Sequence, residues 1–280
     1  MGACCKAKSW EKALEVYDEI RSLKLKPTVA TMNALITALC DGDQLRKAME
    51  VFADMKGFGL SPNSITYTIL SVASEKGDDL DVGLELLSRA QEDDIVPNLA
   101  MFRGLIGMCL RRYEKVCSLG EPVMSSSSGT PQIDNKWTSL ALKIYRESVI
   151  AQLKPSADIV SKVLGCLQLP RAAALRNRLI EDLGVSSESA KPSKLCSLLD
   201  GFGEYDPRAF SLFEEAASLG VVPGVSFKAN PIVVDVRNLN THNAEVYILT
   251  VLRALKHRLA AGNNIYFFLT ASSTCLKRLS

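Results

Sequence analysis

The chain has 280 residues, of which 47% are hydrophobic and 23% are charged, and its net charge is +2 at pH 7. Such a composition is typical of a folded globular protein and excludes a largely disordered one. The small net charge neither requires nor excludes a polyanionic partner, so a nucleic-acid-binding surface has to be local. No apolar run reaches the ~18 residues that cross a membrane, so we expect no membrane partner.

The eight cysteines and two histidines do not follow a metal-binding or disulfide pattern. No C-x-x-C motif occurs, and His242 and His257 are too few to complete a metal site. We therefore predict free thiols in a reducing compartment, with no metal and no cofactor.

Residues 1–28 open with the tail of one helical pattern, through Lys6, and continue with an amphipathic helical pattern, Trp10–Leu23, which ends before Pro27. The chain opens inside a helical pattern, so we interpret 1–28 as the second half of a repeat. For the same reason we expect the chain to be part of a longer protein.

Prolines then mark a fixed period. Pro27, Pro62 and Pro97 lie 35 residues apart, and each is followed within four residues by a new apolar helical pattern. A period of about 20 to 50 residues is typical of proteins built from stacked repeats.

Two whole repeats, 29–63 and 64–98, share one plan. Each has two amphipathic helical patterns separated by a glycine, Gly42 or Gly77, and each closes just after a proline. A single helical hairpin cannot bury the apolar sides of both helices, so neighbouring repeats must stack. We therefore predict a mainly α protein, a right-handed α-α solenoid of helix-turn-helix repeats.

The next repeat, 99–156, is degenerate because a Ser-, Gly- and Pro-rich segment delays its second helix. We predict an inserted loop at about 113–136. Pro155 lies 14 residues after Ala141, the same distance that separates the matching alanine and proline in the earlier repeats. The insertion therefore falls inside a repeat and not at a domain boundary.

Beyond this point the period weakens. We interpret 157–186 and 195–223 as further degenerate repeats, joined by a Ser- and Lys-containing linker at 187–194.

The segment 224–280 has a different pattern. A strand pattern (Pro231–Val236), a helix pattern (Asn243–Leu259) and a second strand pattern (Ile265–Leu269) follow one another. This order predicts a parallel βαβ unit, which is incomplete because two strands alone do not make a stable covered sheet.

The segment TMNALITALCDGDQLRKAMEVFADMKGFGLSPN resembles the pentatricopeptide repeat, whose pattern is TYNxLIxxxCxxGxxxxAxxxFxxMxxxGxxPx. The next repeat, TYTILSVASEKGDDLDVGLELLSRAQEDDIVPN, is similar but looser, and the resemblance covers roughly residues 1–223. Stretches such as GEPV, NKWTS and VLGCLQLP resemble plant members of this family that mature and stabilise the chloroplast message of the Rubisco large subunit. The resemblance implies a chloroplast location, with the mitochondrion as second choice.

The tail IVVDVRNLNTHNAEVYILTVLRAL resembles the start of the small MutS-related domain that follows some of these arrays. Arg237, Asn238 and Leu239 stand where that domain has a His-Gly-Leu motif. This departure argues against nuclease activity, for which Asp235 is the acidic candidate.

The pentatricopeptide resemblance implies one base per repeat, read by the fifth and the last residue of each repeat. Two further positions are implied, the second residue flanking the base and the thirteenth contacting phosphate. The predicted base-reading residues are Asn33 with Asn63, for a pyrimidine, and Thr68 with Asn98, for adenine. The predicted flanking residues are Ala30 and Ile65, and the predicted phosphate contacts are Lys6, Lys76 and Arg111.

We therefore expect a non-enzymatic protein that binds single-stranded RNA and covers the 5′ region of an mRNA. The alternative is a scaffold that binds protein partners through the degenerate repeats. Salt dependence separates the two, because phosphate binding weakens steeply as salt rises.

Overall fold

A computed structural model describes residues 10–121, 123–125, 132–169, 205–224, 232–260 and 267–270. The chain divides into two compact units, Met1–Met108 (unit one) and Cys109–Ser280 (unit two). The predicted contact Lys6, the linker at 187–194 and the helical patterns around it lie outside the described residues.

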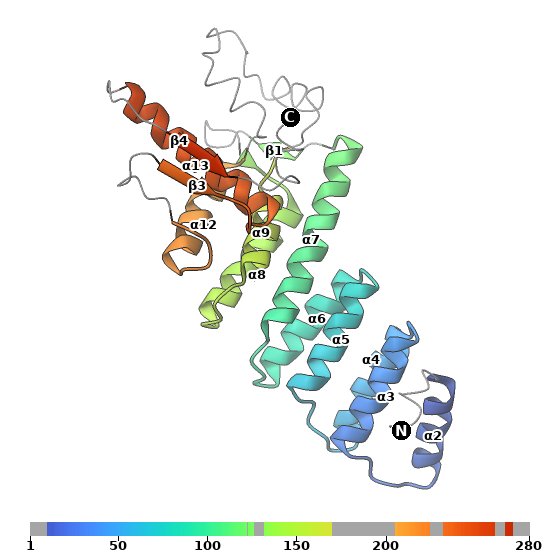
Figure 1. The fold of residues 1–280 in the computed structure, drawn as a ribbon. Helices are drawn as coiled ribbons and strands as arrows, with labels where there is room; N and C mark the ends of the chain where they lie inside the picture. The colour runs from blue at the N-terminus through green and yellow to red at the C-terminus, as the bar shows by residue number, and fades with distance from the viewer. Residues whose placement is uncertain are drawn as a thin grey trace. The chain divides into compact units, whose positions relative to one another are not determined.

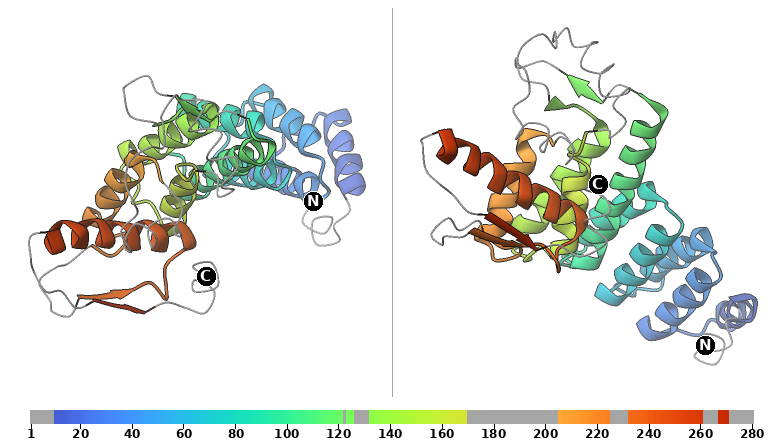
Figure 2. Two further views of the ribbon diagram at one scale, coloured as in Figure 1. Left: turned by 90° about the horizontal axis from the view of Figure 1, so that it is seen from above. Right: turned by 45° about the horizontal axis from the view of Figure 1, so that its top comes forward.

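Unit one is a row of helical hairpins. Its helices are α2 (Trp10–Ser22), α3 (Val29–Asp41), α4 (Leu45–Gly57), α5 (Ser64–Lys76), α6 (Leu80–Glu92) and the first half of α7 (Leu99–Leu119). α3 packs against α4 within its own hairpin and against α5 of the next, so consecutive hairpins stack in chain order (Figures 1 and 2). The mainly α, helix-turn-helix architecture predicted from the 35-residue period is confirmed.

The stacking closes a continuous core in unit one. Met32, Leu35 and Ile36 of α3 are fully buried, and Phe52 of α4 meets Tyr67 of α5 edge to face at a ring distance of 5.3 Å. An α4 residue therefore packs on the following hairpin, as a repeat that cannot bury its apolar face alone requires.

The 35-residue period also appears in the backbone. Lys24, Gly59 and Asp94 occupy the left-handed region with φ between 51° and 70°, and each lies three residues before the proline that closes its repeat. Gln152 and Gly220 of unit two stand three residues before Pro155 and Pro223 in the same conformation. Unit two therefore keeps the repeat boundary where the side-chain pattern has weakened.

The described residues of unit two form helices and two short pairs of strands. Its elements are the second half of α7, β1 (Met124–Ser125), β2 (Gln132–Ile133), α8 (Lys136–Ile150), α9 (Ala157–Gly165), α12 (Pro207–Ser218), β3 (Ile232–Asp235), α13 (Thr241–Ala260) and β4 (Phe267–Thr270). β3 pairs in parallel with β4, Ile232 opposite Phe267, and α13 connects the two strands (Figure 1). The predicted βαβ arrangement is confirmed for these residues.

The loop predicted at 113–136 starts too early. α7 continues to Leu119 because Tyr113 is buried with Val123 and Ile133, and its hydroxyl donates to the Gln168 carbonyl at 2.6 Å. After α7, the described residues of the insertion include two short strands. β1 and β2 pair antiparallel, with Met124 opposite Ile133. The Ser- and Gly-rich composition marked the insertion but not its boundary.

A buried carboxylate ties distant parts of unit two together. Asp206 caps α12, and its side chain is fully buried. One of its oxygens accepts from the Ile133 backbone N–H at 2.8 Å, and the other accepts from the Arg208 backbone N–H and guanidinium at 2.9 and 2.8 Å. Burial acts to raise the pKa of Asp206, but the hydrogen bonds from Arg208 and Ile133 outweigh it and hold the pKa below its usual range.

Candidate nucleic-acid interface

The structure brings the first predicted base-reading pair, Asn33 and Asn63, into direct contact. Asn33 lies in the first turns of α3, and Asn63 is the N-cap of α5, the first helix of the next repeat. The Asn33 Nδ2 donates to Asn63 Oδ1 at 3.3 Å. Residues 30 positions apart therefore form one polar pair where two repeats meet.

Thr66, which sequence reasoning did not select, completes this first pair. Its hydroxyl lies 2.7 Å from Asn33 Oδ1 and donates to it, while the Asn63 backbone N–H donates to Thr66 Oγ1 at 3.1 Å. The Thr66 backbone N–H donates in turn to Asn63 Oδ1 at 3.1 Å, which makes a capping box. The sequence could have indicated Thr66 by its place as the third residue of the predicted helix, where a capping-box partner is expected.

These contacts decide which hydrogen-bonding groups remain for a ligand. Both side-chain oxygens of the first pair accept from the protein, and Asn63 Nδ2 has no partner among the described residues. Asn33 is 8% exposed, whereas Asn63 is half-buried and more accessible. The first pair therefore offers amide N–H donors to a ligand.

The second predicted pair, Thr68 and Asn98, is also in contact. Asn98 Nδ2 donates to Thr68 Oγ1 at 2.6 Å, and Asn98 Oδ1 accepts from the Met101 backbone N–H at 3.1 Å. The Thr68 hydroxyl donates to the Ser64 carbonyl at 2.7 Å. What remains is one N–H of Asn98 and one lone pair of Thr68, a donor beside an acceptor.

Apolar side chains flank Thr68 on the exposed side of α5. Ile65, a predicted flanking residue, is 61% exposed, and Val72 is 48% exposed one turn beyond Thr68. Ala30, the corresponding residue of α3, is exposed but small. An exposed Ile and Val at helical spacing around a polar residue are suited to contact a flat apolar ring, and sequence reasoning missed Val72.

The predicted phosphate contacts have different surroundings. Lys76 is exposed at the end of α5, and its Nζ lies 2.6 Å from Asp43 Oδ1. The hydrogen bond that Lys76 donates to Asp43 and the negative charge of Asp43 raise the pKa of Lys76. Arg111 is exposed on the part of α7 that belongs to unit two.

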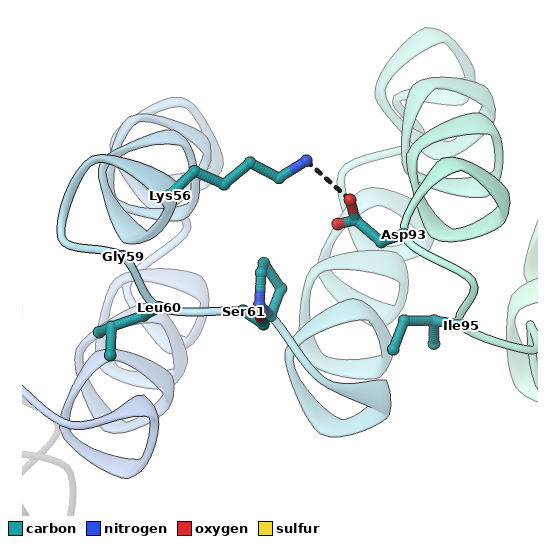
Figure 3. A pocket seen from close by; sticks show the side chains of 7 residues that line it. Lys56, Gly59, Leu60, Ser61, Asp93 and Ile95 are labelled. Carbon is teal, nitrogen blue, oxygen red and sulfur yellow. Dashed lines mark hydrogen bonds and ion pairs between the residues drawn. The ribbon is translucent and has the colours of Figure 1, made fainter.

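The pocket drawn in Figure 3 lies elsewhere on unit one. It has a volume of about 370 Å³, and its lining includes Lys56 and Asp93, whose ion pair spans 2.7 Å (Figure 3). Tyr67 also donates to Asp93, at 2.6 Å, and the hydrogen bonds from Lys56 and Tyr67 hold the pKa of Asp93 below its usual range. The two charges satisfy each other, and none of the predicted base-reading residues lines this pocket.

The acidic candidate of the βαβ segment is already bound by a neighbour. Asp235 accepts from the Arg237 backbone N–H and guanidinium at 3.1, 2.9 and 2.7 Å. Within the described ranges, no three His, Cys, Asp or Glu side chains are grouped closely enough to hold a metal ion. The helices searched in those ranges include none with the length and hydropathy of a membrane span.

Comparison with known families agrees with the stacked hairpins of unit one. Sequence profiles match the PPR repeat family over residues 1–41 and 27–72, and the pentatricopeptide repeat domain over residues 50–112. Residues 1–112 therefore consist of pentatricopeptide repeats, which lie in unit one and at the start of unit two.

A curated pentatricopeptide repeat-containing protein is similar to part of this chain. The chain is 57% identical over 165 residues to "Pentatricopeptide repeat-containing protein MRL1, chloroplastic" of Arabidopsis thaliana. The match covers 59% of this chain and 15% of that protein, so the chain spans a small part of its relative's length.

Solved pentatricopeptide structures are also similar at low sequence identity. The PPR domain of Arabidopsis thaliana protein-only RNase P 1, in complex with tRNA, is 16% identical with a TM-score of 0.44, covering 70% of this chain and 90% of that one. Maize PPR10 is 18% identical with a TM-score of 0.45, covering 79% of this chain and 28% of that one.

Proposed function

We propose that unit one binds single-stranded RNA, with Asn33 and Asn63 reading one base and Thr68 and Asn98 reading the next. The observation that carries this proposal is that both predicted pairs are in hydrogen-bond contact and keep unused donor capacity. Each pair lies where two stacked repeats meet, so the pairs follow one another at the spacing of the repeats.

The unused groups match the predicted bases. Pyrimidines carry acceptors on the Watson–Crick edge, O2 and N3 in cytosine and O2 and O4 in uracil, which suit the N–H donors of Asn63. Adenine places its N1 acceptor beside its N6 donor, which suits the donor and acceptor left on Asn98 and Thr68. Ile65 and Val72 flank the second base on its apolar faces.

The two pairs supply limited affinity. A well-read base contributes roughly 1–3 kcal/mol, so two contribute about 2–6 kcal/mol. A chain with two base-reading pairs binds weakly, and we propose that a longer array confers specificity for the target.

The cellular role that we propose is protection and maturation of an organellar mRNA by covering its 5′ region, without catalysis. The similarity to a chloroplastic protein of Arabidopsis supports a chloroplast location, with the mitochondrion as the second choice. The ion pair that occupies Asp235 supports binding over cleavage in the βαβ segment.

The test replaces Asn63 with aspartate. Asn63→Asp keeps an oxygen that can cap α5, but it removes both N–H donors, so the pyrimidine preference at the first base should be lost. Fluorescence anisotropy with RNAs that differ at that base measures the preference. Asn135→Asp is the matched control, because the side-chain oxygen of Asn135 also caps a helix, α8, and lies outside the proposed interface.

An unchanged base preference in Asn63→Asp would show that the assignment of the first pair is wrong.

The degenerate repeat 99–156 favours a protein-binding role for that part of the chain. At its two base-reading positions, Arg103 binds Glu75 at 3.4 Å and Ser156 caps α9. Neither position carries an asparagine, the side chain whose unused N–H the two pairs of unit one offer. Partner binding through this region should be insensitive to salt, whereas RNA binding through unit one should weaken as salt rises.

A further inference from the structure

Thr66 lies at the centre of the first pair but belongs to the following repeat. It is fully buried, and its hydroxyl is 2.7 Å from Asn33 Oδ1 and 3.1 Å from Asn63 Oδ1. A hydroxyl has one hydrogen to donate, and the shorter distance assigns it to Asn33. Thr66 therefore links the base-reading residue of one repeat to the cap of the next.

The orientation of a carboxamide decides what it offers a ligand, because one end accepts and the other donates. The donation from Thr66 keeps Asn33 Oδ1 pointing toward α5, and Asn33 Nδ2 then faces Asn63 Oδ1. Asn63 Oδ1 also accepts from the Thr66 backbone N–H, so the Nδ2 of Asn63 is the end that remains for a ligand. Without the hydroxyl, the carboxamide of Asn33 can rotate by half a turn, which exchanges its oxygen and its nitrogen. The pair then no longer presents N–H donors alone to a ligand.

We propose that Thr66 is a positioning residue that sets the base specificity of the Asn33–Asn63 pair. This inference rests on the proposed function of that pair. Thr66 does not touch the base but holds both amides in the orientation that favours an acceptor-bearing pyrimidine edge. The specificity of the repeat 29–63 thus depends on the third residue of the helix that follows it.

The second pair provides an internal contrast. Met101 occupies the position of Thr66 one repeat later, is 1% exposed, and has no hydroxyl to donate. There the Thr68 hydroxyl is fixed within its own helix by the Ser64 carbonyl. The preference for the second base should therefore be independent of a residue like Thr66.

The experiment measures base preference in the full chain carrying Thr66→Val, which removes the hydroxyl and keeps the branched shape. The ligands are oligoribonucleotides in which two adjacent bases are flanked by abasic riboses, which fixes the bases that can be read. We expect the pyrimidine preference at the first base to fall about tenfold, as the loss of one oriented hydrogen bond implies. The preference at the second base should be unchanged, and Thr66→Ser should restore the first.

Thr31→Val is the matched control. Thr31 is the third residue of the preceding repeat, and its hydroxyl contacts Thr28 at 3.0 Å and not Asn33 or Asn63. This variant should leave the preference at the first base unchanged. If Thr66→Val does not fold, Thr66→Ala removes the same hydroxyl without placing a methyl group where the hydroxyl was.

Two results would overturn the inference. In the first, Thr66→Val leaves the first base preference intact while Asn63→Asp abolishes it. In the second, Thr66→Val lowers the melting temperature and weakens binding of every RNA equally, which is a purely structural effect. Failure of the proposed function looks different, because the unaltered chain would then show no base preference and Asn63→Asp would change nothing.

Discussion

Unit one and unit two are stabilised in different ways. In unit one the same contacts recur at the period of the repeat, and each hairpin packs on the next. In unit two, single polar side chains join segments far apart in the sequence. Asp206 is the main example, since it binds Ile133 and Arg208 through its side chain while its backbone N–H donates to the Leu167 carbonyl at 2.9 Å.

The difference shows how a repeat array changes when its period weakens. Repeated packing spreads stability over many similar contacts, so no single polar group is critical in unit one. Unit two contains an insertion and a βαβ segment, and buried hydrogen bonds replace the missing regular contacts. Substitutions of comparable chemistry should therefore cost more in unit two than in unit one.

The largest effect is expected for Asp206→Ala. The change leaves the Ile133 N–H and the Arg208 guanidinium without their buried acceptor, at a cost of about 3 kcal/mol in the free energy of unfolding. Urea unfolding gives the magnitude, and hydrogen exchange should show lost protection in α9 and α12. Asp158→Ala is the control, because Asp158 is accessible and pairs with Lys162 of its own helix.

An equal effect of Asp206→Ala and Asp158→Ala would remove the contrast between the two units.

An intermediate effect is expected at the repeat boundary of unit one. Gly59 has φ of +70°, so Gly59→Ala should cost about 1–2 kcal/mol through backbone strain. Gly57→Ala, two residues earlier, places its methyl in open space at the end of α4 and should stabilise by roughly 0.5–1 kcal/mol. Urea unfolding of both variants checks the opposite signs, and the same sign in both would refute the boundary assignment.

A smaller effect is expected for Asp93→Asn. Lys56 and Tyr67 hold the pKa of Asp93 below its usual range, so the carboxylate stabilises the fold at neutral pH. This stability is lost as the pH falls below the ordinary aspartate pKa of about 3.9 and through the lower pKa of the folded state. The variant should be less stable at pH 7 by under about 1 kcal/mol, and the difference should shrink in acid.

Thermal unfolding between pH 3 and pH 7 measures this dependence. Asp94→Asn, a neighbouring change that leaves the contacts of Asp93 with Lys56 and Tyr67 in place, is the control. A pH-independent difference for Asp93→Asn would mean that the carboxylate charge is not what stabilises this junction.

The smallest effect on stability is expected for Lys76→Ala. Its ion pair with Asp43 is exposed, so the melting temperature should not change measurably. RNA affinity should instead become less dependent on salt, by about one unit in the logarithmic slope, if Lys76 neutralises a phosphate. Lys143→Ala, an exposed lysine of α8, is the control and should leave the slope unchanged.

The fold of unit one could be predicted largely from the sequence, because local rules and packing agree there. Prolines at a fixed period marked the boundaries, and the glycine at Gly59 takes the left-handed conformation expected at a helix end. The insertion boundary was wrong because the helix beyond Arg112 is held by burial of Tyr113 against residues from the other side of the loop. Such long-range burial leaves no local signature.

The candidate site shows the same limit. Resemblance placed Asn33 with Asn63 and Thr68 with Asn98, but it did not indicate how their amides are oriented. Orientation depends on Thr66, whose contact with Asn33 exists only once two hairpins have stacked. The cap at Asp206 could have been recognised, since Asp followed by Pro is typical of a helix start, but its partners Ile133 and Leu167 could not.

The contact of Thr66 with the preceding repeat also bears on grafting repeats between arrays. A block cut at its formal boundary, 29–63, would carry Asn33 and Asn63 into a new array without the hydroxyl that orients them. The transferable block is instead Val29 to Thr66, with the exchange point three residues inside the next helix. A transferred block that ended before Thr66 would keep its base specificity only where the recipient array already supplies a hydroxyl at that position.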